Sequence, residues 1–109
     1  WGSWSGPCRL EAPELQMVYE TYKDQGFTII GVNWLENSPQ EAKEFINDVG
    51  ITYPTGEDVG EVVANTYHIQ GAPENFIIDR DGNIYLFVIG FTEYDKLSPI
   101  VESLLAESS

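Results

Sequence analysis

The apolar residues of the chain lie in blocks that alternate between helical and strand-like spacing. Residues 6–25 carry apolar side chains at intervals that place them on one helix face, which predicts a first helix. Residues 27–34 form a compact apolar run, rich in β-branched residues and bounded by Gly26, which predicts a buried strand. The apolar face of the predicted helix consists of Leu10, Leu15, Val18 and Tyr22.

A second helix is predicted from the residues that begin and end it. Ser38-Pro39-Gln40-Glu41 has the form of a capping box with proline at the first helical position, so the helix begins there. Gly50 is typical of the left-handed residue that follows a last helical turn. Residues 59–67 predict a short third helix. The inward residues of the second helix are expected to be Ala42, Phe45, Ile46 and Val49.

The last part of the chain predicts a hairpin followed by a helix. Residues 76–79 and 84–89 are apolar runs joined by the turn at 80–83, a β-hairpin pattern. The run Asp79-Arg-Asp-Gly82 lacks the glycine register and distal glutamate of a calcium loop, so it is interpreted as a turn. Thr92 is expected to cap a final helix that buries Leu97, Val101, Leu104 and Leu105.

The chain length, the net charge and the single cysteine and histidine restrict the classes of function that the sequence allows. The 109 residues, in the order α-β-α-α-β-β-α, predict one α/β domain over residues 1–109. Five Lys and Arg against 18 Asp and Glu give a net charge of −13, which argues against nucleic acids and anionic membranes as partners. No apolar run approaches the roughly 18 residues of a membrane span. Cys8 and His68 are single, so neither an internal disulfide nor a structural zinc site is expected.

Two segments carry the candidate chemistry. Residues 1–15 read W-G-S-W-S-G-P-C-R-L-E-A-P-E-L, and residues 71–79 read G-A-P-E-N-F-I-I-D. The first resembles the active-site stretch W-C-G-P-C-R-x-E-x-P-x-L of thioredoxin-like thiol–disulfide oxidoreductases. The second, like Gly-Val-Asn-Trp at 31–34, resembles the TlpA/ResA/CcmG group of cytochrome c maturation. The resemblance covers essentially the whole chain and implies a thioredoxin-like fold, a central mixed β-sheet flanked by helices, and no cofactor or metal.

The chain departs from this family at its first cysteine. In the family that cysteine lies at a helix N-cap, where free N–H groups and the helix dipole stabilise the thiolate. The matching residue here is Ser5, and Cys8 matches the second, resolving cysteine. A serine hydroxyl is not ionised near neutral pH without a strong base, so two-thiol exchange is expected to be lost while the N-cap is kept. Natural loss and a deliberate Cys→Ser replacement are both compatible with Ser5.

The resemblance also assigns roles to other residues. Glu11 and Glu74 are expected to raise the pKa of an active-site thiol and to exchange protons with it. Glu11 could alternatively be a solvated charge, and Cys8 a buried apolar residue. Trp34 closes a strand at its carboxyl end, where open α/β sheets place ligands, and simple packing is the alternative for it. A cis peptide bond is expected before Pro73. The residues expected to contact a polypeptide substrate are Trp4, Gly6, Pro7, Ala72 and Pro73.

Two other functions stay open. Ser5-Gly-Pro-Cys8 fits the S/T-x-x-C core of a one-cysteine peroxiredoxin, although Trp1 replaces the proline of that pattern and only Arg9 and Arg80 could assist. The second open function is that of a redox-silent thioredoxin-like module that binds a partner through the Pro73 loop.

The resemblance implies protein thiols or disulfides as partners, such as apocytochrome c or a membrane thiol reductase. It further implies an extracytoplasmic location, with any anchor in a segment before Trp1. The first core strand of the family is expected to be absent from the chain, which would leave the strands at 27–34 and 75–79 without a shared neighbour.

Overall fold

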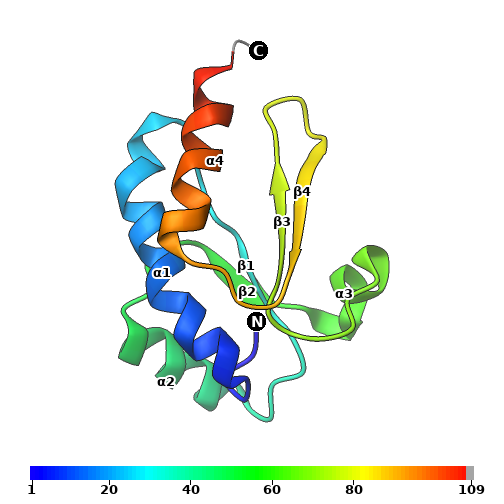
Figure 1. The fold of residues 1–109 in the computed structure, drawn as a ribbon. Helices are drawn as coiled ribbons and strands as arrows, with labels where there is room; N and C mark the ends of the chain where they lie inside the picture. The colour runs from blue at the N-terminus through cyan, green and yellow to red at the C-terminus, as the bar shows by residue number, and fades with distance from the viewer. Residues whose placement is uncertain (108–109) are drawn as a thin grey trace.

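A computed structural model describes residues 1–107. Figure 1 shows α1 and α4 side by side, with the hairpin of β3 and β4 next to them and α3 at the far edge. No helix within residues 1–107 is long and apolar enough to cross a membrane. In chain order the elements are α1 (Gly6–Tyr22), β1 (Gly31–Asn33), α2 (Pro39–Val49), β2 (Thr55–Glu57), α3 (Val62–Tyr67), β3 (Glu74–Ile78), β4 (Ile84–Ile89) and α4 (Tyr94–Ala106).

The expected central sheet is present as two separate, two-stranded sheets. Strand β1 pairs with β2 in parallel, with Val32 opposite Gly56, and β3 pairs with β4 antiparallel. No ladder joins β1 to β3 among the described residues. A cavity of about 580 Å³ is lined by residues 26–32 before and within β1 and by residues 73–80 of the hairpin. The two sheets therefore face each other across an apolar gap rather than through shared hydrogen bonds.

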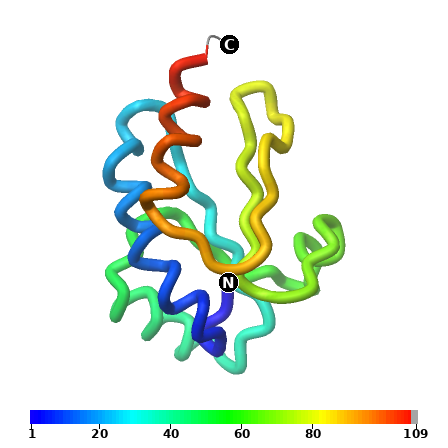
Figure 2. The backbone as a smooth tube through the Cα atoms, in the orientation of Figure 1, coloured from blue at the N-terminus to red at the C-terminus, as the bar shows by residue number. Residues whose placement is uncertain are grey.

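The strand expected over 27–34 and the helix expected over 6–25 are both shorter in the structure than the sequence predicts. The strand expected over 27–34 forms a ladder only at Gly31–Asn33, because its partner β2 is equally short and residues 27–30 face the gap. Figure 2 shows the chain turning back after α1 toward β1. The helix expected over 6–25 ends at Tyr22, and a 3₁₀ turn completes it.

The helix expected over 59–67 is split into a 3₁₀ turn and α3. The break comes from Gly60 and Glu61, whose φ angles of 71° and 55° are left-handed. Thr92 does not cap α4, so that expectation is wrong. Glu93 occupies the N-cap without a side-chain bond, and the buried Thr92 directs its backbone N–H to Glu11 instead.

Three local expectations are confirmed. The Ser38 hydroxyl accepts a hydrogen bond from the N–H of Glu41 at 3.2 Å, which makes it the N-cap of α2. Helix α2 ends at Gly50, whose φ of 81° is left-handed. In the hairpin turn, the Asp79 carboxylate accepts bonds from the N–H groups of Asp81 and Asn83.

The buried core consists of two clusters on either side of α1. Phe45 is 1% exposed and stacks on Trp1 with 4.9 Å between the ring centroids, in a cluster with Ala12 and Tyr53. The second cluster joins α1 to α4 and consists of Val18, Tyr22, Leu97 and Val101. The segment before α1 is thereby anchored through Trp1, which positions the candidate site at the N-terminus of that helix.

Candidate active site

Ser5 lies where the N-terminus of α1 meets the loop before β3. Its hydroxyl accepts a hydrogen bond from the N–H of Cys8 at 3.3 Å, so the expected N-cap is confirmed. The same hydroxyl donates to the carbonyl oxygen of Ala72 at 3.1 Å. The side chain is 4% exposed. Because its proton is directed at a carbonyl, the Ser5 oxygen has no base beside it that could make it a nucleophile.

The loop around Pro73 is held by hydrogen bonds on both sides. The peptide bond between Ala72 and Pro73 is cis, as expected. The carbonyl of Pro73 accepts from the N–H of Gly90 at 2.9 Å, which ties the loop to the end of β4. The Glu74 carboxylate accepts from the N–H groups of Gln70 and Gly71 at 2.9 and 3.0 Å. Glu74 therefore shapes its own loop.

Cys8 is a free thiol inside the first turn of α1 and is 3% exposed. Its backbone N–H is the donor that Ser5 caps. Any reaction at this sulfur requires an opening of the helix N-terminus or of the Pro73 loop, since little of the side chain meets solvent.

Glu11 is a buried carboxylate that joins three distant segments. It is 3% exposed and accepts hydrogen bonds from the side chain of Asn75 at 2.8 Å and from the N–H of Thr92 at 3.0 Å. Burial raises the pKa of Glu11, although both hydrogen bonds oppose this. The alternative of a solvated charge is excluded. Asn75 lies within the matched segment 71–79, whereas no sequence signal pointed to Thr92 as a partner.

The segment before Ser5 is clamped by a second carboxylate. Glu36 accepts from the Ser3 N–H at 2.5 Å, from the Ser3 hydroxyl at 2.6 Å and from the Asn33 side chain at 2.9 Å. Burial by itself would raise the pKa of Glu36, but the bonds from Ser3 and Asn33 outweigh it and lower that pKa. The guanidinium of Arg9 donates to the Ser3 carbonyl at 2.9 Å. Sequence reasoning missed Glu36, which lies just past the matched segment at 31–34.

The expected substrate-contacting residues gather at this end of the molecule. Gly6 and Pro7 are exposed in the first turn of α1, and the Ser5 bond brings Ala72 and Pro73 alongside them. Trp4 is 46% exposed beside them, and its indole N–H donates to the Trp34 carbonyl at 3.1 Å.

Within residues 1–107, no group of three or more His, Cys, Asp or Glu side chains is arranged to hold a metal ion. His68 is exposed at the end of α3 with a left-handed φ of 57°.

Comparison with known proteins identifies the family. The model of the AhpC/TSA family matches residues 1–87. The chain belongs to the AhpC/TSA family. It is 30% identical over 104 residues to the thiol-disulfide oxidoreductase ResA of Bacillus anthracis, covering 95% of this chain and 60% of that protein. It is 34% identical over 107 residues to the thiol:disulfide interchange protein HelX of Rhodobacter capsulatus, covering 97% of this chain and 58% of HelX.

The fold of this AhpC/TSA chain is that of solved thioredoxin-like proteins. A thiol:disulfide interchange protein of the thioredoxin family from Chlorobium tepidum superposes with a TM-score of 0.86 at 29% identity, covering 96% of this chain and 75% of that one. StoA from Bacillus subtilis superposes with a TM-score of 0.83 at 27% identity, covering 93% of this chain and 77% of StoA. The chain is thus a thioredoxin-like member of the group that contains ResA and HelX, and it spans about 60% of the length of those relatives.

Proposed function

We propose that this domain carries the thiol–disulfide exchange site of the ResA and HelX group in a form that Ser5 has disabled. The observation that supports this is the position of Ser5. It caps α1, touches the carbonyl of Ala72 and stands one helical turn from Cys8. A thiol in the same place would lie at a helix N-terminus beside the Pro73 loop, where a thiolate is stabilised.

Thiol–disulfide exchange needs two sulfur atoms of the protein that act one after the other. A thiolate attacks one sulfur of a disulfide, the protein–substrate S–S bond forms, and the old S–S bond breaks with release of a thiolate that takes up a proton. A second thiol then attacks the mixed disulfide and frees the product. Cys8 can supply one of these steps and Ser5 neither. The chain is therefore expected to form a mixed disulfide through Cys8 when that thiol is exposed, and to stop there.

Glu11 is the residue proposed to handle protons at this site. Its raised pKa keeps a larger share of the carboxyl protonated than in water, and it lies one turn beyond Cys8 on α1. A protonated carboxyl can donate to a departing thiolate. Glu74 is the second candidate, and its Oε2 accepts hydrogen bonds from the N–H groups of Gln70 and Gly71 in its own loop.

The proposed partners are polypeptides that carry thiols or disulfides, with cytochrome c maturation as the proposed setting. The proposed location is extracytoplasmic. A secreted thiol-disulfide isomerase from Corynebacterium glutamicum, which superposes with a TM-score of 0.88 at 25% identity, supports this location.

The peroxidase alternative has less support, because both arginines are engaged with groups other than Cys8. That chemistry needs an arginine beside the reacting thiolate. Arg9 donates to Ser3 and lies over the ring of Phe45 at 5.1 Å, and Arg80 donates to the carbonyl of Leu105 at the other end of the molecule.

The test is to restore the missing thiol. Ser5→Cys should reduce the disulfides of insulin in the presence of dithiothreitol, and the introduced thiol should titrate below the free-cysteine value of about 8.5. In that background, Glu11→Gln should lower the thiol pKa further, because it removes a negative charge. The unchanged chain should not turn over insulin.

Adding Cys8→Ser to Ser5→Cys is the control, since it removes the second step and should leave only a stable mixed disulfide. If Ser5→Cys folds and its two thiols are inert at neutral pH, the exchange proposal fails and the binding-module alternative replaces it. Consumption of hydrogen peroxide by the unchanged chain would instead support a peroxidase.

A further inference from the structure

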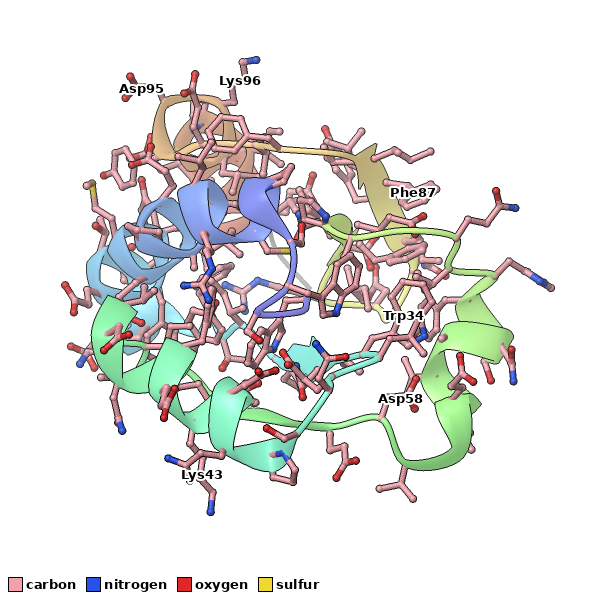
Figure 3. The ribbon with its side chains drawn as sticks, turned by 90° about the horizontal axis from the view of Figure 1, so that it is seen from below. Trp34, Lys43, Asp58, Phe87, Asp95 and Lys96 are labelled. Atoms are coloured by element: carbon pink, nitrogen blue, oxygen red, sulfur yellow. The ribbon has the colours of Figure 1, made fainter. Side chains whose placement is uncertain are left out.

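Beside the proposed exchange site, two tryptophans form a corner that the exchange chemistry does not use. The Trp4 and Trp34 rings meet edge to face, with centroids 6.2 Å apart and planes at 60°. Trp34 follows β1, and Trp4 immediately precedes Ser5. Figure 3 shows Trp34 between the loop that precedes α1 and helix α3.

Both rings are fixed in place by hydrogen bonds and packing. The Trp4 indole N–H donates to the carbonyl of Trp34 at 3.1 Å. Trp4 also lies on Gly2, since a Cβ at that position would stand 2.1 Å from the Trp4 indole nitrogen. Part of Trp4 thus rests on backbone, and 46% of the residue remains exposed to solvent.

A carboxylate completes the corner. The Trp34 indole N–H donates to Oε1 of Glu61 at 3.2 Å. Glu61 sits at the N-cap of α3 in a left-handed conformation, with φ of 55°. An indole face attracts cations through its quadrupole, and a carboxylate at its edge adds direct charge attraction. Such a combination fits a guanidinium or an ammonium group.

The cations of this chain lie elsewhere, so the corner is free for a partner's cation. Lys43 and Lys96 project at the periphery in Figure 3, away from Trp34. Lys23 lies over Tyr19 at 6.0 Å, Arg9 is bound to Ser3 and Arg80 to Leu105. The net charge of −13 favours a basic partner as well.

We propose that Trp4, Trp34 and Glu61 form a subsite for an arginine or lysine side chain of an extended polypeptide whose cysteine faces position 5. This inference rests on the proposed exchange site and adds its substrate preference. Trp4 directly precedes Ser5, whose hydroxyl donates to the carbonyl of Ala72, which places the subsite beside the loop proposed to hold the substrate.

The experiment uses the Ser5→Cys chain and two capped peptides. Each peptide has one cysteine joined by a disulfide to nitrothiobenzoate. One carries arginine two residues before and after the cysteine, since those side chains share a face of an extended strand. The other carries neutral citrulline there. The introduced thiolate attacks the peptide sulfur, the protein–peptide S–S bond forms, and nitrothiobenzoate thiolate leaves and is followed by absorbance.

The arginine peptide should react about three- to thirtyfold faster, the range that one exposed cation–π contact and one exposed ion pair give together. Glu61→Gln keeps an acceptor for the Trp34 indole and removes only the charge, so it should lower this ratio. Glu44→Gln is the matched control, because Glu44 also accepts one side-chain N–H, from Gln40, but lies on α2. It should leave the ratio unchanged.

The two proposals fail in different ways. If neither peptide reacts faster than with the unchanged chain, the exchange site itself is wrong. If both peptides react at the same rate, or if Glu61→Gln and Glu44→Gln lower the ratio equally, the exchange site stands and the cation subsite is overturned. Trp4→Leu is a further variant that removes a half-exposed ring, and it too should lower the ratio.

Discussion

The hydroxyl of Ser5 is predicted to stabilise the fold through two bonds, of which only one is a helix cap. In Ser5→Ala, the N–H of Cys8 loses its acceptor and the carbonyl of Ala72 loses its donor. An N-cap serine contributes about 1 kcal/mol, and a further net hydrogen bond contributes about 1 kcal/mol. The free energy of unfolding should therefore fall by roughly 2 kcal/mol.

Ser38→Ala provides the internal comparison. Ser38 caps α2 through one bond from Glu41 at 3.2 Å, and its substitution should cost about 1 kcal/mol. The difference between the two variants isolates the bond to Ala72, the contact that joins α1 to the loop containing Pro73. For a domain of this size, the loss at Ser5 corresponds to a decrease in melting temperature of roughly 8–12 °C.

Urea unfolding followed by circular dichroism measures both variants under one set of conditions. The midpoint of Ser5→Ala should lie below that of Ser38→Ala, with equal slopes. If the two substitutions cost the same, or if Ser5→Ala costs less, the hydroxyl does not hold the loop. Position 5 would then not bridge α1 and the loop containing Pro73.

Two further predictions concern buried groups. Burial raises the pKa of Glu11 above 4.5, so its contribution to stability is fully present below that value and is lost as pH rises through the folded pKa. Glu11→Gln should remove this loss of stability, so the urea midpoint of the variant should fall less than that of the unchanged chain between pH 4 and 8. Midpoints that decline in parallel for the two proteins would contradict this prediction. Phe45→Ala should cost about 3–5 kcal/mol. Phe91→Ala, at an exposed ring, should cost far less, and equal losses would contradict the described core.

Local sequence determined three of the helix ends, at Ser5, Ser38 and Gly50. In their capping roles, Ser5, Ser38 and Gly50 act on backbone groups within four residues of themselves, so these roles can be predicted without the rest of the chain. The hairpin turn at Asp79 is local in the same way. The two motifs also sufficed to predict the family and the cis peptide bond before Pro73, because they match a known pattern over nearly the whole chain.

Tertiary structure alone decided the contacts between distant segments. Glu11 is buried because Asn75 and Thr92 supply its donors from 64 and 81 residues away, and a helical spacing cannot predict such partners. The same holds for Glu36 and its clamp on Ser3. Residues 27–30 have the composition of a strand, yet a ladder requires a partner. Since β1 and β3 face a gap, the hydrogen bonds that would define a longer strand are not formed there.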